Sequence, residues 1–230
     1  MKRITLFSLA SAVLLTLSAC SSDNTTQTES SSSQTVQTET EGLVSSADPS
    51  DMFTDNDLEI GYDEEHSAKI TLSGDSASSD SDAVQIFGST VTITDEGTYI
   101  LSGTLHNGMI VVNAEDTDKV RLVLNGIDVT NSTSAAIYVP EADKVFITTV
   151  SGTENTLSNG GEYIAIDDNN IDAVIFSKSD LTLNGAGSLA IHAAAGHGIV
   201  SKDDLALTSG TYDITAASHG LSGKDSVRIA

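Results

Sequence analysis

The sequence predicts an all-β protein: a right-handed, single-stranded parallel β-helix of about six repeats. Two observations favour this fold class. After Lys69, apolar and polar residues alternate in short segments separated by Gly, Asn or Asp, a pattern typical of strands and turns. Similar segments then recur every 22 to 25 residues, and none of them carries the apolar stripe of an amphipathic helix.

The first residues have the pattern of an export signal. Lys2 and Arg3 form a short basic start, and an apolar stretch from Ile4 to Leu17 follows. The sequence Leu-Ser-Ala-Cys that ends at Cys20 resembles the lipobox of bacterial lipoproteins. We therefore expect residues 1–19 to be a lipoprotein signal peptide and Cys20 to be acylated, which would anchor the domain on the outer side of the cell membrane.

Residues 20–50 have the composition of a disordered tether. Twelve of the twenty residues from Ser21 to Thr40 are Ser or Thr, and the stretch contains no Lys or Arg. Such a segment buries too little apolar surface to offset the entropy that ordering would cost. The folded domain is therefore predicted to span residues 51–230.

The charge of the chain excludes one class of partner. It has 33 acidic and 10 basic residues, with a formal net charge of −23. Nucleic-acid binding needs clustered Lys and Arg, so no nucleic-acid partner is expected. The single cysteine also excludes an intrachain disulfide and a thiolate zinc site.

The internal repeat is visible when five segments are aligned on one apolar residue each. These anchors are separated by 25, 36, 24 and 22 residues, and they are Val120, Val145, Leu181, Leu205 and Val227. The longest interval holds residues 158–172, which we interpret as an insertion between strands. A second apolar column is predicted six residues before each anchor, at Ala114, Val139, Ile175, Ile199 and Leu221.

In a parallel stack, aligned positions lie above one another, so these apolar columns are predicted to fill the interior. The last segment, Val227 to Ala230, stops within a repeat and has no capping element. We therefore expect the chain to be incomplete at its C-terminus or to be completed by another piece.

Several segments together resemble a known family. They are 97–105, 123–126, 134–139 and 175–181, and they resemble the carbohydrate-binding-domain family of bacterial β-helix surface proteins, formerly a domain of unknown function. The resemblance extends from about Phe53 to the end. It implies a pectate-lyase-like right-handed β-helix, bound calcium, and affinity for plant or acidic polysaccharides.

Two acidic groups are candidate calcium ligands, because calcium takes six to eight oxygen ligands. The first lies in the insertion and comprises Asp167, Asp168, Asn170 and Asp172. The second comprises the aligned acids Asp180, Asp203 and Asp204, to which Asp225 also belongs. The alternative for the first group is a solvated turn, since Asp and Asn are common turn residues.

Two columns are candidates for carbohydrate binding. Lys178, Lys202 and Lys224 each lie three residues before an anchor and form either a cationic stripe for sugar carboxylates or a ladder that pairs with the neighbouring Asp column. His197 and His219 also align, and they either contact a ligand or are ordinary turn residues.

Three functions remain open from sequence. The first is a surface-anchored module that binds acidic or plant-type polysaccharide with calcium, for which the lack of Trp leaves Tyr138, Tyr163 and Tyr212 as sugar platforms. The second is a calcium-dependent pectate-type polysaccharide lyase. The third is a non-catalytic adhesin or spacer.

Overall fold

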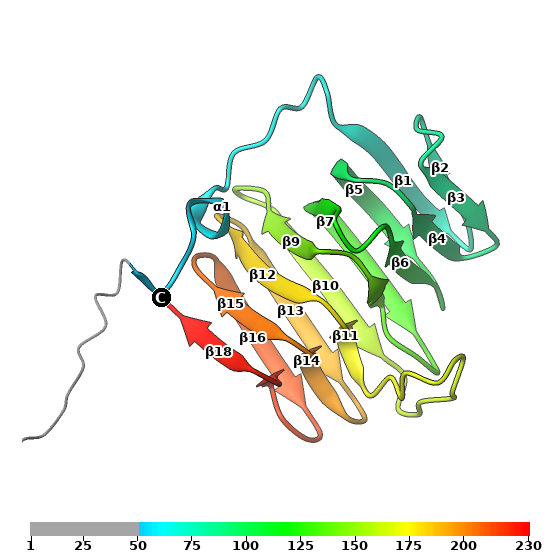
Figure 1. Cartoon of the computed structure of the whole chain (residues 1–230). Helices are drawn as coiled ribbons and strands as arrows, with labels where there is room; N and C mark the ends of the chain where they lie inside the picture. The colour runs from blue at the N-terminus through cyan, green and yellow to red at the C-terminus, as the bar shows by residue number, and fades with distance from the viewer. Residues whose placement is uncertain (1–50) are drawn as a thin grey trace, which may run out of the picture. The chain divides into compact units, whose positions relative to one another are not determined.

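The computed structural model describes residues 51–230, and this part is almost entirely β-structure (Figure 1). The predicted signal peptide, Cys20 and the tether lie outside the described residues. Most strand pairs are parallel, so the all-β prediction with parallel strands is confirmed. Among the described residues, no helix has the length and apolar character needed to cross a membrane.

The strands form three faces around one apolar interior. The first face runs through β1 (Ala68–Gly74), β5 (Gly97–Leu105), β7 (Lys119–Asn131), β9 (Lys144–Thr149), β12 (Asp180–Gly185), β15 (Asp204–Leu207) and β18 (Ser226–Ile229). The second comprises β10 (Glu154–Asn159), β13 (Ser188–Ala193) and β16 (Thr211–Ala216). The third comprises β3 (Val84–Phe87), β4 (Thr90–Ile93), β6 (Met109–Asn113), β8 (Ile137–Glu141), β11 (Ala173–Ser177), β14 (His197–Ser201) and β17 (Leu221–Gly223).

Strand β7 joins the first two faces into one sheet. Its residues 119–124 pair with β9, and its residues 128–131 pair with β10. Between them lies Gly126, with φ of 74°, a left-handed conformation that favours glycine. In later repeats the same bend separates two strands, for example β12 and β13. Only at the start are pairs antiparallel: β2 (Ala77–Ser79) pairs with β1, and β3 pairs with β4.

The predicted anchor column is confirmed by the strand register. Val120 pairs with Val145, and Leu181 pairs with both Val145 and Leu205. Leu205 in turn pairs with Val227. All anchors except the last are buried, and their neighbours two residues on extend the same interior column.

The second predicted column is only partly right. Ile175, Ile199 and Leu221 pair in register, but the partner of Ile175 in β8 is Ile137 and not Val139. In β6 the position belongs to Ile110, four residues before the predicted Ala114. The chain from the second column to the anchor is longer in the early repeats, from Ile110 to Val120 and from Ile137 to Val145, so a constant offset of six residues fails there.

A segment that we call the N-terminal strap, residues 51–62, lies against the outer side of the first face. It contains the one short helix of the described chain, α1 (Asp55–Leu58), which begins at Thr54 with a capping box to Asp57. The Asp57 carboxylate lies 2.7 Å from Lys144 Nζ and accepts a 2.5 Å hydrogen bond from Thr182 Oγ1. Asn184 Nδ2 donates to the backbone oxygens of both Asp57 and Glu59, each at 3.0 Å, so the strap is tied to several strands.

Candidate functional site

The three predicted lysines form a row at the corner between the third and first faces. Lys178, Lys202 and Lys224 follow β11, β14 and β17 and are all exposed. The backbone N–H of Lys202 donates to Ser177 O at 2.8 Å, and that of Lys224 donates to Ser201 O at 3.0 Å. Successive lysines are therefore one strand spacing apart, about 4.8 Å. We call these three residues the lysine row.

The lysine row is mostly unpaired. Lys224 Nζ lies 3.6 Å from Asp225, whereas Lys178 and Lys202 form no ion pair with any carboxylate of residues 51–230. Lys202 Nζ instead lies 5.1 Å from the centroid of the Phe176 ring, within cation–π range. The charge-balancing alternative therefore accounts for one lysine of three, and two ammonium groups are left facing solvent.

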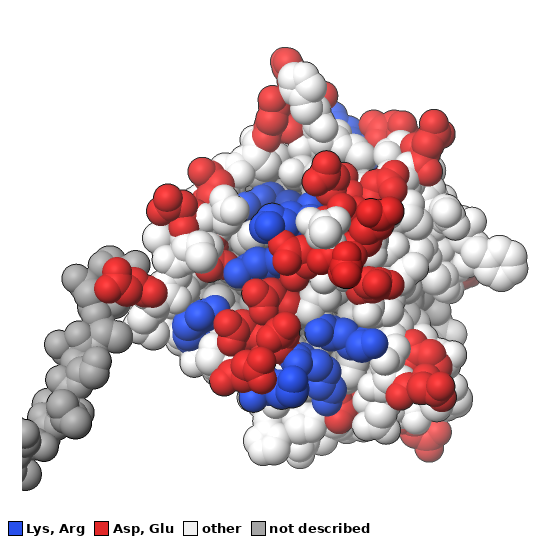
Figure 2. Space-filling model, viewed as in Figure 1, with Lys and Arg blue, Asp and Glu red and all other residues white. Residues whose placement is uncertain are grey.

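Acidic side chains lie directly beside this row. The Asp225 N–H donates to Asp203 O at 3.3 Å, and the two carboxyl groups also share a hydrogen bond. Partial burial, with the nearby charges of Asp180 and Asp225, raises the pKa of Asp203 above its usual range. Figure 2 shows basic and acidic side chains side by side on the face that carries β12, β15 and β18 in Figure 1.

The remaining predicted acids of this second group have partners of their own. Asp180 and Asp204 open strands that are neighbours in register, and Asp180 Oδ1 accepts a hydrogen bond from Asp204 N at 3.2 Å. Asp204 also pairs with Arg228 at 3.1 Å and with Ser226 Oγ at 2.7 Å. Asp203 and Asp225 differ in this respect: among residues 51–230, Lys224 pairs with Asp225, and no cation pairs with Asp203.

The insertion begins two residues later than predicted, because Ser158 and Asn159 belong to β10; it comprises residues 160–172 and lies along the outer side of the third face. Beneath it is a second apolar cluster that includes Tyr138, Phe176 and Ile171, whereas the main core fills the space between the faces. The Tyr138 hydroxyl donates to the Asp167 carboxylate and accepts a 2.6 Å hydrogen bond from Asn169 Nδ2. These bonds hold the middle of the insertion against the sheet.

The predicted acids of the insertion do not converge. Asp167 is directed to Tyr138, while Asp168 and Asn170 are exposed and Asn170 adopts φ of 51°. Asp172 faces the other way, 3.9 Å from His197 Nε2. In residues 51–230 no group of three or more His, Cys, Asp or Glu side chains is arranged to hold a metal.

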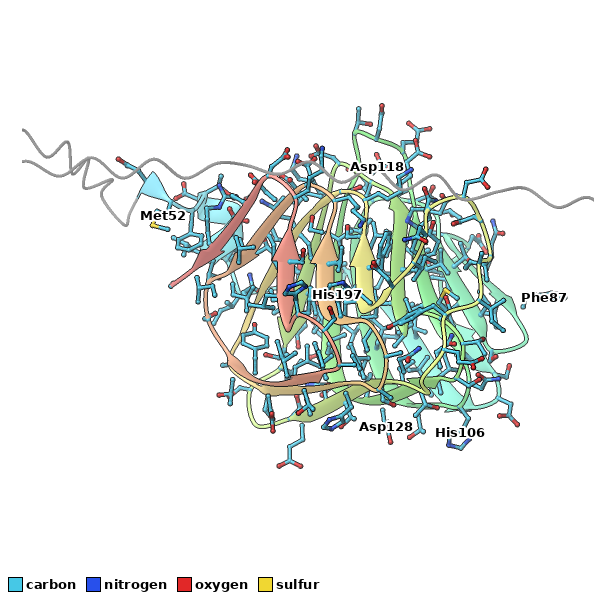
Figure 3. The ribbon with its side chains drawn as sticks, turned by 90° about the horizontal axis from the view of Figure 1, so that it is seen from below. Met52, Phe87, His106, Asp118, Asp128 and His197 are labelled. Carbon is cyan, nitrogen blue, oxygen red and sulfur yellow. The ribbon has the colours of Figure 1, made fainter. Side chains whose placement is uncertain are left out.

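The two predicted histidines are brought together. The rings of His197 and His219 stack with centroids 4.9 Å apart and an interplanar angle of 10°, and their Nδ1 atoms are 3.2 Å apart. His197 lies on the third face, which Figure 3 views directly. Because the ring planes are nearly parallel, the two Nδ1 lone pairs do not point to a common metal position.

Of the three tyrosines expected as sugar platforms, Tyr138 is buried, whereas Tyr163 and Tyr212 are half-buried. Tyr138 is only 3% exposed, and its hydroxyl is used by the insertion. Burial raises the pKa of Tyr138 to about 12, with the Asp167 hydrogen bond acting in the same direction. The sequence analysis also missed Phe176, whose ring contacts both Tyr138 and Lys202. A correct register for β8 would have paired Tyr138 with Phe176.

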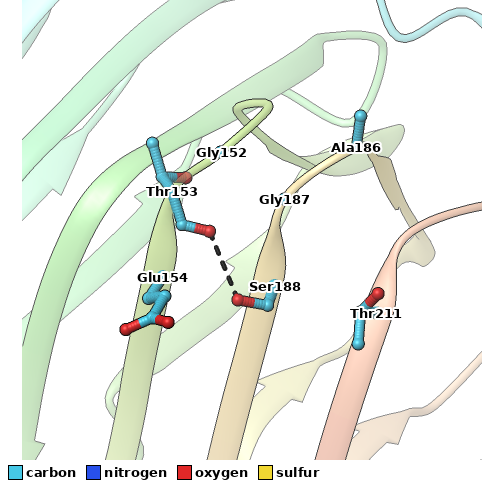
Figure 4. A pocket seen from close by; sticks show the side chains of 7 residues that line it. All are labelled: Gly152, Thr153, Glu154, Ala186, Gly187, Ser188 and Thr211. Atoms are coloured by element: carbon cyan, nitrogen blue, oxygen red, sulfur yellow. Dashed lines mark hydrogen bonds between the residues drawn. The ribbon is translucent and has the colours of Figure 1, made fainter.

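A separate hollow of about 260 Å³ lies where the chain turns onto the second face (Figure 4). Ser188 Oγ donates to Thr153 O across it at 3.3 Å. Its lining contains one carboxylate and no basic side chain: Gly152, Thr153, Glu154, Ala186, Gly187, Ser188 and Thr211. Such a lining offers hydrogen bonds to neutral groups but no counter-charge for an anion.

Comparison with known proteins agrees with this architecture. Residues 87–230, more than half of the chain, match the family model described as carbohydrate-binding domain-containing protein. A protein of that description from Acetivibrio thermocellus is 36% identical over 152 residues, which cover 65% of this chain and 53% of that protein. The chain thus spans about half the length of this curated relative.

A solved structure is also similar. It is described as the polysaccharide lyase-like protein from C. thermocellum, studied as a gadolinium derivative. The TM-score is 0.65 at 31% sequence identity, and the match covers 71% of this chain and 79% of that chain. On the strength of the family match, the chain belongs to the carbohydrate-binding domain-containing proteins, as the sequence resemblance predicted.

Proposed function

We propose that this protein is a cell-surface module that binds acidic polysaccharide along the lysine row. The observation that carries the proposal is the pair of exposed ammonium groups, Lys178 and Lys202, which have no carboxylate partner in the described chain although acids outnumber bases 33 to 10. A polymer of uronic acids presents carboxylates at regular intervals. A row of cations at strand spacing suits such a ligand better than a neutral glycan.

Calcium is part of this proposal. The Asp203–Asp225 pair lies next to the row and concentrates negative charge that Lys224, 3.6 Å from Asp225, does not fully offset, since the pKa of Asp203 is still raised. A calcium ion at this pair would relieve that repulsion and would accept further oxygens from water and from a uronate. The acids of the insertion are weaker candidates because they point in different directions.

The fold and the anchoring belong to the same proposal. The parallel registers support a right-handed parallel β-helix, because parallel crossovers are right-handed in nearly all proteins. Acylation of Cys20, with residues 20–50 as a tether, would hold the domain on the outer surface of the cell, where it meets polysaccharide. A membrane-retention assay on Cys20→Ala tests the anchor separately from binding.

The binding claim is tested by calorimetric titration of the full chain with oligogalacturonate in the presence of calcium. Lys202→Ala is compared with Lys69→Ala, which removes the same charge from β1, where Lys69 lies 3.8 Å from Glu64. We expect Lys202→Ala to weaken binding roughly fivefold, as for one exposed charge pair, and Lys178→Ala/Lys202→Ala to weaken it further. Lys69→Ala should bind as the unchanged protein does.

Three results would overturn this proposal. Unsaturated uronate products, detected by their ultraviolet absorbance, would make the protein a polysaccharide lyase. Equal affinity of Lys69→Ala and Lys178→Ala/Lys202→Ala would remove the lysine row from the binding surface, and no binding to any acidic glycan would favour a spacer.

A further inference from the structure

A second basic site lies on the first face, away from the lysine row. A hollow of about 440 Å³ opens between the N-terminal strap and the starts of β5 and β7. Its volume is within the range of small-molecule sites, about 300–1,000 Å³. The lining residues come from four parts of the chain and are Asn56, Glu96, Gly97, Thr98, Lys119, Arg121 and Phe146.

Arg121 is held rigidly at this hollow. Its Nη1 donates to Glu59 O at 2.9 Å and to Thr148 Oγ1 at 2.7 Å. The guanidinium carbon lies 4.8 Å from the centroid of the Phe146 ring, so one face of the group is covered. Because these contacts fix the plane of the guanidinium, its free edge is already oriented before any ligand arrives.

The free edge of Arg121 has no partner within residues 51–230. None of the described carboxylates forms an ion pair with it, and its Nε and Nη2 atoms have no hydrogen-bond acceptor there. Burial lowers the pKa of Arg121, and the charge of Glu59 offsets this only in part. A half-buried guanidinium without a carboxylate is costly, and in so acidic a chain a suitable residue would be easy to supply.

The other cations nearby are already paired, which makes Arg121 distinct. Lys144 is bound to Asp57, and Lys119 Nζ lies 2.6 Å from Asp143. Arg228 is a useful comparison. It occupies the position in β18 that is equivalent to Arg121 in β7, and it forms an ion pair with Asp204. At this hollow a fixed cation therefore forms no ion pair with a described carboxylate, although Glu96 lies on the rim.

We infer that this hollow is a second saccharide site, one that takes a single uronate residue with its carboxylate on the free edge of Arg121. Guanidinium and carboxylate form two parallel hydrogen bonds in such a pair. The side chains of Asn56 and Thr98 on the rim offer donors and acceptors for sugar hydroxyls. The Glu96 carboxylate on the same rim accepts hydrogen bonds from hydroxyls and disfavours a second acidic group.

This site is independent of the lysine row, because the two are built on different strands. Arg121 lies on β7, whereas the row follows β11, β14 and β17. The two claims can therefore be tested separately. Variants of the lysine row should leave binding at Arg121 intact, and variants of Arg121 should leave binding at the lysine row intact.

The test uses the full chain in the presence of a calcium chelator, so that binding at a calcium-dependent site does not contribute. The Arg121 Nε–H signal is followed by NMR while trigalacturonate is added, with its methyl ester and acetate as matched ligands. We expect the acid to shift this signal and neither control to do so at the same concentration. No shift with trigalacturonate overturns the site, and an equal shift with acetate overturns its assignment to a saccharide.

A variant pair gives the second readout. Arg121→Lys keeps the charge but loses the planar fork, and we expect it to weaken trigalacturonate binding about tenfold to a hundredfold. Arg228→Lys is the matched control and should bind as the unchanged protein does. Equal affinity of the two variants would overturn the inference. The NMR readout on the unchanged protein remains decisive if Arg121→Lys does not fold.

Discussion

At the residue scale, Asp57 shows how a short segment is fixed to the sheet. It is 1% exposed and receives Lys144, Thr182 and Thr54 as hydrogen-bond partners. Burial alone would raise the pKa of Asp57, but these partners outweigh it and hold the pKa at about 2. The carboxylate therefore stabilises the fold above its ordinary pKa of 3.8, and this contribution is lost as pH falls through about 2.

Asp57→Asn should destabilise the protein by about 3–5 kcal/mol at neutral pH, because it leaves the Lys144 charge buried without a partner. The measurement is the free energy of unfolding in urea, with Asp55→Asn in the same helix as an exposed control. The difference between the two variants should shrink as pH falls toward 2. Equal stability of both variants at pH 7 would contradict this account of the strap.

At the element scale, glycine geometry sets where the chain bends between faces. Gly185, at the end of β12, has φ of 122°, and a Cβ there would lie 2.4 Å from the backbone N and O of Thr149. Gly126 has φ of 74°, but a Cβ there would meet nothing within 4 Å. The two positions share a left-handed backbone and differ in the close approach of a neighbouring repeat.

Gly185→Ala is therefore expected to lower the free energy of unfolding by about 1–3 kcal/mol more than Gly126→Ala does, because only Gly185→Ala adds overpacking to backbone strain. Chemical denaturation of the two variants gives the comparison directly. If Gly126→Ala proved as harmful as Gly185→Ala, backbone conformation alone would set the cost, and the close stacking at Gly185 would be irrelevant.

The same elements show what the sequence could predict. The anchor column followed from Val120 and its equivalents because their strands begin at a constant distance from the preceding turn. The second column failed at Val139, since β8 continues through Pro140 and Glu141 beyond the residue that pairs with Ser177, which shifts the register by two residues. That shift also hid the contact of Tyr138 with Phe176, because the predicted register places Tyr138 opposite Val174.

Contacts between distant segments were beyond prediction for a different reason. Asp57 belongs to a segment outside the repeat, and the strap is tied to several strands through its backbone oxygens, one of which accepts a hydrogen bond from Arg121. Backbone acceptors leave no trace in the residue pattern. The lysine row, by contrast, was predicted because it recurs with the repeat itself.

At the scale of the whole molecule, calcium should act as a stabilising ligand. With an affinity typical of extracellular calcium modules, about 10 mM calcium should stabilise the fold by about 1.4–2.7 kcal/mol and raise the Tm by about 3–10 °C. Asp203→Asn/Asp225→Asn should abolish this response, whereas Asp167→Asn should retain it. If Asp167→Asn lost the stabilisation by calcium and the double variant kept it, the calcium ion would bind at the insertion instead.

The measurement that tests the central claim most directly is a crystal structure of the chain with oligogalacturonate and calcium. The account predicts sugar carboxylates in hydrogen-bond contact with Nζ of Lys178 and Lys202, on the corner that the insertion flanks. Sugar bound in the hollow of Figure 4, with both ammonium groups still facing solvent, would contradict it.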